Sequence, residues 1–238
     1  MTNNPHLLIL HGWNHNSTFW INAHEQLPNC KLYIPDLPGF GKEPLPSTTL
    51  AIPDYATWVE EYIQQNIQSD SSLKLQDTKL ALMGHSFGGR ISAYIASKNP
   101  KWLHTLILYA APTLYRPSLQ VQARLAISKA LKKIIADKQA KKLIKFLNPE
   151  LAQADKNNLG AVYRKTITFD QTEDLKKIIT PTYIIYGEND SEVSKKVIME
   201  TAKLINNSHL EIIQNQGHNI HLDNPTLFYG LIRKILNL

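Results

Sequence analysis

The chain has 238 residues and a single cysteine, Cys30. One cysteine cannot form an intrachain disulfide, so a disulfide-stabilised secreted scaffold is excluded. A reducing compartment is the expectation, most simply the cytoplasm. In keeping with this, the first five residues carry no basic side chain, and the apolar run Leu7–Leu10 is too short for the core of a secretion signal.

Long hydrophobic runs are also missing. No stretch approaches the roughly 18 apolar residues that a membrane helix needs, so no membrane span is predicted. The charged fraction is only 19% and the hydrophobic fraction 43%, which excludes a disordered chain and fits one folded domain over residues 1–238. The net charge of +6 would suit a nucleic-acid binder, but no such partner is predicted, because the basic residues are not interleaved with aromatic ones and no nucleic-acid motif is present.

Motifs for metals and nucleotide cofactors are lacking as well. The pairs His11/His15 and His218/His221 have the spacing of metal ligands, but no cysteine or carboxylate pattern accompanies them. The glycines do not form the Gly-x-Gly-x-x-Gly pattern of a dinucleotide-binding turn. No cofactor and no metal are therefore predicted.

What the chain does contain is a series of short, continuous apolar runs. Such runs are typical of parallel strands that are covered on both faces. Helical patterns lie between most of them, which predicts an α/β fold with a doubly wound, mostly parallel sheet of about six strands. The predicted strands are His6–Leu10, Lys31–Ile34, Lys79–Met83, Thr105–Tyr109, Thr182–Tyr186 and His209–Ile213, and examples of the predicted helices are Tyr55–Ile67, Ile91–Ser97 and Lys195–Leu204.

One interval interrupts this alternation. Between the fourth and fifth predicted strands lie roughly seventy residues without a strand pattern, which is too long for a simple crossover. Gln120–Leu147 and Ala152–Thr166 have helical patterns. We therefore expect a helical segment, residues 113–180, inserted after the fourth strand.

The sharpest local motif is Gly84-His85-Ser86-Phe87-Gly88, a Gly-x-Ser-x-Gly pattern between an apolar strand and a helix. A serine on such a tight turn has its hydroxyl lifted clear of the sheet, and bulky neighbours would clash there. The pattern alone is common by chance, and an ordinary glycine-rich turn is the alternative. Its position between strand and helix favours a nucleophile, Ser86, with the backbone N–H of Phe87 at the positive end of the helix.

A second backbone donor is expected in the loop after the first strand. That loop reads His11-Gly12-Trp13. An attacked carbonyl becomes an oxyanion, which needs two preorganised N–H groups. Trp13 and Phe87 are the predicted pair, with a simple chain turn at His11-Gly12 as the alternative reading.

A serine hydroxyl needs a base, and the base needs an acid to orient it. His218 follows the last predicted strand, at the end where sites form in parallel sheets, and His221 is the alternative base. Asp190 follows the fifth strand in a polar turn, with Glu188 as the alternative acid. Ser86, Asp190 and His218 are therefore the predicted catalytic residues.

In this order, the motifs resemble those of the α/β-hydrolase superfamily. The resemblance implies that 113–180 form a cap, and it is closest to small carboxylesterases of the pimeloyl-ester esterase and C–C-bond hydrolase kind. Two departures stand out: a sheet trimmed to about six strands, and a second carboxylate, Glu192, after Asp190. The motifs are His11-Gly12-Trp13, Asp36-Leu37-Pro38-Gly39-Phe40-Gly41, Gly84-His85-Ser86-Phe87-Gly88-Gly89, Gly187-x-x-Asp190 and Gly217-His218.

The resemblance implies a serine hydrolase that cleaves a small-molecule ester or thioester. A C–C-bond hydrolase of the same fold and a ligand-binding receptor without turnover are the alternatives. Epoxide hydrolases and haloalkane dehalogenases of the superfamily use an aspartate nucleophile, so the serine at position 86 argues against both. The sequence specifies neither the acyl and leaving groups nor the oligomeric state.

The predicted cap is strongly basic, with fourteen lysines and arginines against six acidic residues in 113–180. Such charge can attract anionic substrates. It can equally lie on the outer, solvated face of a helix, and the helical spacing of Ile127, Leu131, Ile134 and Ile135 favours this second interpretation.

Overall fold

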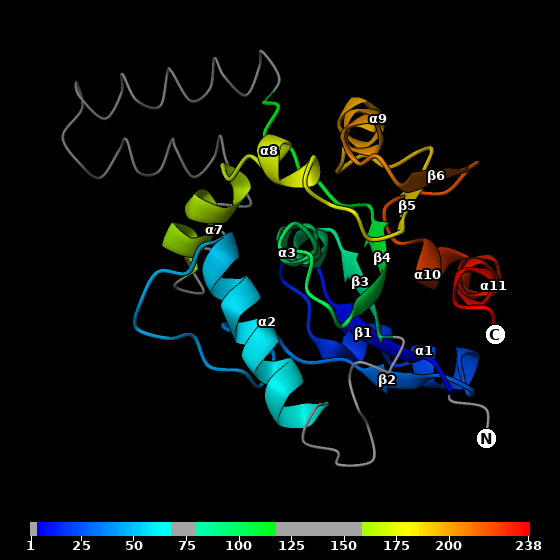
Figure 1. Ribbon diagram of the computed structural model, residues 1–238, viewed down its shortest axis with the longest axis horizontal. Helices are drawn as coiled ribbons and strands as arrows, with labels where there is room; N and C mark the ends of the chain where they lie inside the picture. The colour runs from blue at the N-terminus through cyan, green and yellow to red at the C-terminus, as the bar shows by residue number, and fades with distance from the viewer. Residues whose placement is uncertain (1–3, 68–79, 118–158) are drawn as a thin grey trace. The chain divides into compact units, whose positions relative to one another are not determined.

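The computed structural model describes residues 4–67, 80–117 and 159–238 (Figure 1). Six strands form one sheet in the order β2-β1-β3-β4-β5-β6, and every neighbouring pair is parallel. The predicted parallel six-stranded sheet is therefore confirmed. The strands are β1 (His6–Leu10), β2 (Lys31–Tyr33), β3 (Leu80–His85), β4 (Leu103–Tyr109), β5 (Thr182–Gly187) and β6 (Ser208–Ile213).

Burial differs between the inner and the edge strands. Residues of β1, β3, β4 and β5 are almost all buried, as expected for continuous apolar runs between two helical layers. The edge strands β2 and β6 are partly exposed, because each has a neighbour on one side only. The expectation of cover on both faces therefore holds for the four inner strands.

Helices lie on both faces of the sheet. None of those that the structure describes is long and apolar enough to cross a membrane. The helices that the structure describes are η1 (Ser17–Trp20), α1 (Ala23–Gln26), α2 (Ile52–Asn66), α3 (Phe87–Ala96), α7 (Gly160–Ile167), α8 (Thr172–Leu175), α9 (Lys195–Leu204), α10 (Ile220–Asp223) and α11 (Pro225–Leu236).

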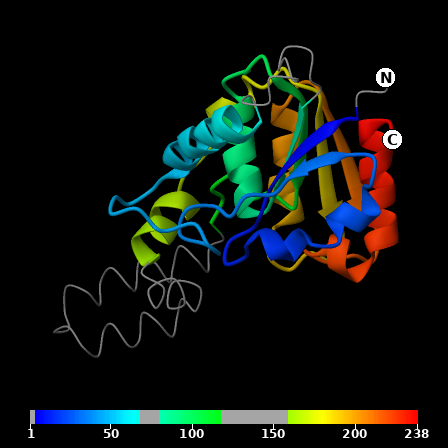
Figure 2. The same ribbon diagram turned by 90° about the horizontal axis from the view of Figure 1, so that it is seen from below.

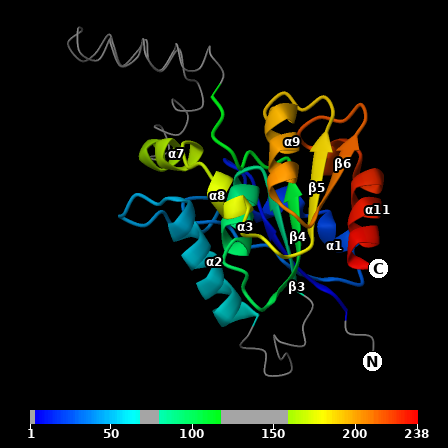
Figure 3. The same ribbon diagram turned by 45° about the horizontal axis from the view of Figure 1, so that its top comes forward.

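The two faces of the sheet have different cover. Figures 2 and 3 show α3 on one face and α11 on the other. On the α11 face, side chains such as Ile9, Met83 and Ile107 join one apolar cluster with Trp20, Phe228 and Ile232. On the other face α3 packs against β1, β3 and β4, and α2 and α8 pack against α3.

Glycine allows α3 to approach the sheet closely. A Cβ on Gly88 would lie 2.3 Å from the carbonyl oxygen of Leu10, and a Cβ on Gly84 would lie 2.4 Å from that of Gly88. Both neighbours are backbone atoms of regular elements, so neither can easily move away. The helix backbone is thereby set directly against the end of β1.

By backbone contacts the chain divides into two compact units. The first contains Met1–Ser47, Ile52–Leu114 and Asp170–Leu238, and the second contains Thr48–Ala51 and Tyr115–Phe169. Within the second, α7 carries Lys165, whose Nζ donates a 3.0 Å hydrogen bond to the carbonyl of Thr49. The helix expected at Gln120–Leu147 lies outside the described residues. The cap over 113–180 stays a prediction.

The chain leaves the first unit after Leu114 and re-enters it at Asp170, and residues next to these two places are hydrogen-bonded to each other. The N–H of Gln171 donates to the carbonyl of Thr113 at 3.3 Å. The side-chain amide of Gln171 donates to the carbonyl of Arg90 at 2.8 Å, and the Arg90 guanidinium donates to the carbonyl of Pro112. We call residues 112–113 and 170–171 the neck. Thr113 and Gln171 have no exposed surface.

The close approach of α3 yields a stability prediction. Replacing Gly88 with alanine forces its Cβ into the Leu10 carbonyl, so we expect Gly88→Ala to lower the free energy of unfolding by about 1 to 3 kcal/mol. Urea denaturation measures the change.

The matched control is Gly230→Ala in α11. There a Cβ meets only the Arg233 guanidinium, at 3.9 Å. A glycine-to-alanine change inside a helix should then stabilise by roughly 0.5 to 1 kcal/mol. Equal effects at the two positions would contradict the close approach.

Candidate active site

Ser86 occupies the turn between β3 and α3 in a strained backbone conformation. Its φ is 51° and its ψ is −112°, outside the regions that side-chain-bearing residues favour. Its N–H donates to the carbonyl of Tyr109 at 2.8 Å, while its own carbonyl accepts from Gly89 and Arg90. These bonds hold the strained turn between the neighbouring strand β4 and the first turn of α3.

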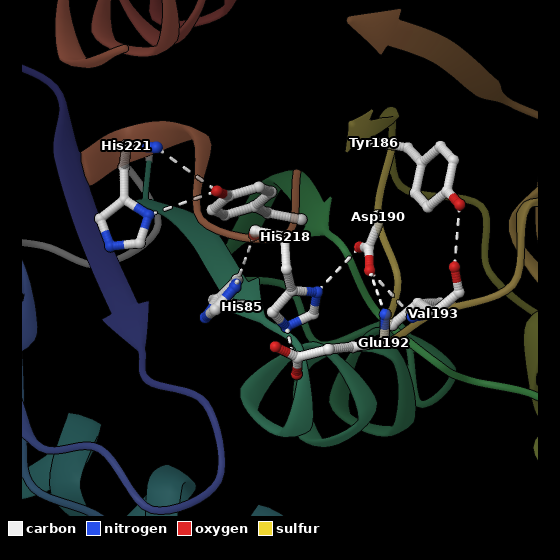
Figure 4. Close-up of polar contacts among 8 residues, drawn as sticks. His85, Tyr186, Asp190, Glu192, Val193, His218 and His221 are labelled. Carbon is white, nitrogen blue, oxygen red and sulfur yellow. Dashed lines mark hydrogen bonds and ion pairs between the residues drawn. The ribbon is translucent and has the colours of Figure 1, made fainter. Parts of the chain in front are cut away.

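Asp190 and His218 are hydrogen-bonded to each other (Figure 4). His218 Nδ1 donates to Asp190 Oδ2 at 2.8 Å, and the aspartate side chain has no exposed surface. The second oxygen, Oδ1, accepts from the N–H groups of Glu192 at 2.8 Å and Val193 at 2.9 Å. The carboxylate is thus fixed by its own turn, and Nδ1 carries the imidazole proton, which leaves Nε2 as the basic nitrogen.

The loops that carry these two residues are brought together by a glycine. A Cβ on Gly187, the last residue of β5, would lie 2.2 Å from the carbonyl oxygen of Gly217. Only glycine therefore allows the loop after β6 to pass so close to the end of β5. The adjacent positions of β5 and β6 in the sheet place Asp190 and His218 at its carboxyl edge.

His218 also lies beside the turn that carries Ser86. The fully buried His85 donates from Nε2 to the carbonyl of His218 at 3.3 Å, and the two ring centroids are 4.8 Å apart. No hydrogen bond joins the Ser86 hydroxyl to His218 in the described structure. The structure therefore brings Asp190 and His218 into contact and holds Ser86 on the neighbouring turn.

The alternative base and acid have different surroundings. His221 is buried and stacks on Trp20 at a centroid distance of 4.2 Å, with Nδ1 3.2 Å from the hydroxyl of Tyr109. Burial lowers the pKa of His221 to about 3, so its ring is neutral. Glu188 is exposed, and among the described residues its carboxylate makes no hydrogen bond to His218. Both alternatives from the sequence are thereby less favoured.

Near His218 Nε2 lies the second carboxylate noted in the sequence. Glu192 Oε2 is 3.4 Å from Nε2, and the Glu192 side chain is 63% exposed (Figure 4). The contact becomes an ion pair when the imidazole is protonated. His218 therefore has a buried carboxylate hydrogen-bonded to Nδ1 and an exposed one 3.4 Å from Nε2.

Trp13 and Phe87, the predicted backbone donors, lie close to each other. Their rings meet edge to face with centroids 5.2 Å apart, and Phe40 packs against both. Phe87 is the first residue of α3, so its N–H belongs to the four that have no acceptor within the helix. The aromatic cluster fixes the loop of Trp13 next to that helix end.

His11 has a role that the sequence analysis missed. Its Nε2 accepts the N–H of Leu37 at 2.9 Å, and its Nδ1 donates to the carbonyl of Gly12 at 2.8 Å. Burial lowers the pKa of His11 to about 4, so the ring stays neutral. His11 thus joins the loops after β1 and β2. In the sequence, its position directly before Gly12 was the signal that could have revealed this role.

Asp36 makes a second link between these loops. Its Oδ1 accepts the N–H of Ser17 at 2.6 Å, and its Oδ2 accepts that of Lys42 at 2.8 Å. Burial raises the pKa of Asp36, but the hydrogen bonds from Lys42 and Ser17 outweigh burial and lower it overall. Gly41, at a φ of 57°, passes so close to Asp36 that a Cβ would lie 2.2 Å from Oδ2. The Asp36–Gly41 motif therefore braces the Trp13 loop.

Metal ligation finds little support at this edge of the sheet. Within residues 4–67, 80–117 and 159–238, no group of three histidine, cysteine, aspartate or glutamate side chains could hold a metal ion. His218 and His221, paired by spacing, have separate partners, Asp190 and Tyr109.

The model of the α/β-hydrolase fold family matches residues 5–165, more than half of the chain. The chain belongs to this family. The α/β hydrolase is 26% identical over 252 residues to pimeloyl-[acyl-carrier protein] methyl ester esterase of Aeromonas salmonicida, with 96% of this chain and 94% of that protein covered. It is 27% identical over 255 residues to 2-succinyl-6-hydroxy-2,4-cyclohexadiene-1-carboxylate synthase of Enterobacter sp., with 98% of this chain and 92% of that protein covered.

Solved structures agree with this assignment of the fold. The esterase EaEST from Exiguobacterium antarcticum matches with a TM-score of 0.73 at 21% identity, covering all of this chain and 94% of that one. The superfamily resemblance seen in the sequence is thus confirmed. The family and the esterase relative support hydrolase activity for this α/β hydrolase.

The buried neutral histidines predict how stability depends on pH. His11, His85 and His221 have pKa values lowered by burial, so between about pH 4 and 6.5 the unfolded chain binds protons that the folded α/β hydrolase does not. The free energy of unfolding should therefore fall as the pH drops through this window. Urea titrations at half-unit pH intervals measure the slope.

A variant isolates one histidine. His221→Phe should lose up to about 1.4 kcal/mol per pH unit of that slope between pH 4 and 6. Its control is the same substitution at the exposed His24, which separates burial of the ring from the loss of a histidine. An unchanged slope in His221→Phe would contradict a neutral, buried ring.

Proposed function

We propose that this α/β hydrolase is a serine esterase that forms an acyl-enzyme on Ser86, with His218 as base and Asp190 as the acid that orients it. The observation that carries the proposal is the 2.8 Å hydrogen bond from His218 Nδ1 to the buried Asp190, at the sheet edge next to the strained Ser86 turn. This is the arrangement in which an imidazole keeps Nε2 free to take a proton.

Acylation follows from these roles. The Ser86 hydroxyl gives its proton to His218 Nε2 as its oxygen bonds to the carbonyl carbon of the ester. The carbonyl electrons move to oxygen, and a tetrahedral oxyanion results. When these electrons return, the bond to the alcohol oxygen breaks, and that oxygen takes the proton from Nε2. The products are a free alcohol and an acylated serine.

Deacylation repeats the steps with water. His218 Nε2 takes a proton from the water as its oxygen bonds to the acyl carbon. Collapse of the second oxyanion breaks the bond to Ser86, and the serine oxygen recovers a proton from Nε2. The carboxylic acid leaves, and the protein returns to its starting state.

The backbone N–H groups of Trp13 and Phe87 are the proposed donors to both oxyanions. The packing of Trp13 against Phe87 and Phe40 supports this, because it fixes the loop that carries one donor beside the helix end that carries the other. His11 and Asp36 also fix this part of the chain, because they accept hydrogen bonds from the N–H groups of Leu37 and Ser17. Donors that are fixed before the reaction stabilise an oxyanion more than donors that must reorganise.

The proposed substrate is a small carboxylic ester or thioester, in line with the esterase among the relatives. Residues 113–180 are the proposed cap. The mechanism uses only side chains and backbone amides, so we propose no cofactor and no metal. A C–C-bond hydrolase would use the same groups, and the substrates tested should therefore include one for that reaction.

Covalent labelling tests the nucleophile. A fluorophosphonate should modify Ser86, and mass spectrometry of the labelled protein should locate the adduct there. A panel of p-nitrophenyl esters of rising chain length, an acyl-thioester and a vinylogous diketone should show turnover of the esters. An adduct at another serine, or turnover of the diketone alone, would refute the esterase proposal.

Substitutions test the division of roles. Ser86→Ala and His218→Ala should each lower kcat by several orders of magnitude, and the double variant should be little worse, because such residues act as a unit. Asp190→Asn should lower kcat roughly a thousandfold or more. Glu188→Gln should retain wild-type kcat. If His221→Ala were the damaging change and His218→Ala the mild one, the proposed base would be wrong.

A further inference from the structure

Glu192 has a firmly held backbone. Its N–H donates to Asp190 Oδ1 at 2.8 Å, as does that of Val193 at 2.9 Å. The carbonyl of the buried Val193 accepts from the hydroxyl of Tyr186 at 2.8 Å. The turn that fixes the proposed acid therefore also fixes the base of the Glu192 side chain, whose carboxylate reaches His218 Nε2.

Among the described residues, little positive charge lies near the carboxylate of Glu192. Its one ion pair among the described residues is with His218, and none is with lysine or arginine. His15 lies close enough for the Glu192 charge to raise its pKa, but burial outweighs this and lowers the pKa of His15 overall. At neutral pH the His15 ring near Glu192 is thus neutral.

The reaction proposed above indicates which part of a substrate meets this charge. His218 Nε2 gives its proton to the alcohol oxygen, so that oxygen lies within hydrogen-bond reach of Nε2. With Glu192 Oε2 3.4 Å from the same nitrogen, the carboxylate comes within about 6 Å of the alcohol oxygen. Glu192 therefore borders the space that the alcohol part of an ester occupies.

We infer that Glu192 is a specificity-determining residue that selects esters whose alcohol part carries a positive charge. The inference rests on the proposed esterase function. The cation attracts Glu192 both in the bound ester and after the C–O bond has broken, because the alcohol leaves as a neutral hydroxyl that keeps its cationic group. An alcohol part that carries a carboxylate is repelled at the same place.

The test compares two butyrate esters of nearly the same shape. One has 2-(trimethylammonio)ethanol as its alcohol and the other has 3,3-dimethylbutanol, so they differ by one charge. The measured quantity is the ratio of kcat/KM for the cationic ester to that for the neutral ester. A change in Ser86 or His218 chemistry affects both esters alike and cancels, so the ratio reports on charge recognition.

Glu192→Gln keeps the size of the side chain and removes its charge. It should lower the ratio by about threefold to tenfold, a modest effect because Glu192 is largely exposed and water screens its charge. Glu188→Gln removes an exposed charge of the same kind four residues earlier and should leave the ratio unchanged. The wild-type ratio should also fall as the salt concentration rises.

An unchanged ratio in Glu192→Gln, with both esters still hydrolysed, would overturn the inference and leave the esterase proposal standing. An equal fall in both glutamine variants would overturn it too, because the effect would then be that of net charge. If neither ester is hydrolysed and fluorophosphonate does not label Ser86, the esterase proposal fails, and the inference fails with it.

Discussion

The close approach of α3 to the end of β1 is the constraint on which the candidate site depends. Gly84 and Gly88 permit it, since a Cβ on either would lie within 2.4 Å of backbone atoms. The approach sets the Ser86 turn and the first N–H groups of α3 beside the loop that carries Trp13. The proposed nucleophile and the proposed oxyanion donors are therefore positioned by backbone packing in the core, where little can shift.

Polar groups around the site reinforce this packing, and three buried histidines do so without carrying a charge. His11, His85 and His221 are buried and neutral, so they act as hydrogen-bonding and aromatic parts of the core. Among the described residues, the carboxylates that contact His218 are the buried Asp190 and the exposed Glu192.

Local patterns predicted most of the fold and the candidate residues. The motifs Gly-His-Ser, Glu-Asn-Asp and Gly-His each lie at or after the end of a strand and can be recognised within a few residues. The parallel sheet places all three at one edge. The Gly-x-Ser-x-Gly motif placed Phe87 at the start of a helix, but the helical pattern itself was recognised only from Ile91, because Gly88 and Gly89 weaken it. The links made by His11 to Leu37 and by Glu192 to His218 depend on loops distant in sequence or on a side-chain direction, which no local pattern encodes.

The neck has a consequence for how this fold can vary. A hydrogen bond joins Thr113 to Gln171. The two parts of the chain that meet there are therefore held together within the first unit, independently of the residues between them. The entropy of closing a loop across such a junction grows only slowly, by about 0.6 kcal/mol for each doubling of loop length. Segments of very different length and composition can therefore be grafted at this junction. Proteins built on the same sheet can in this way differ in this segment while the sheet itself stays the same.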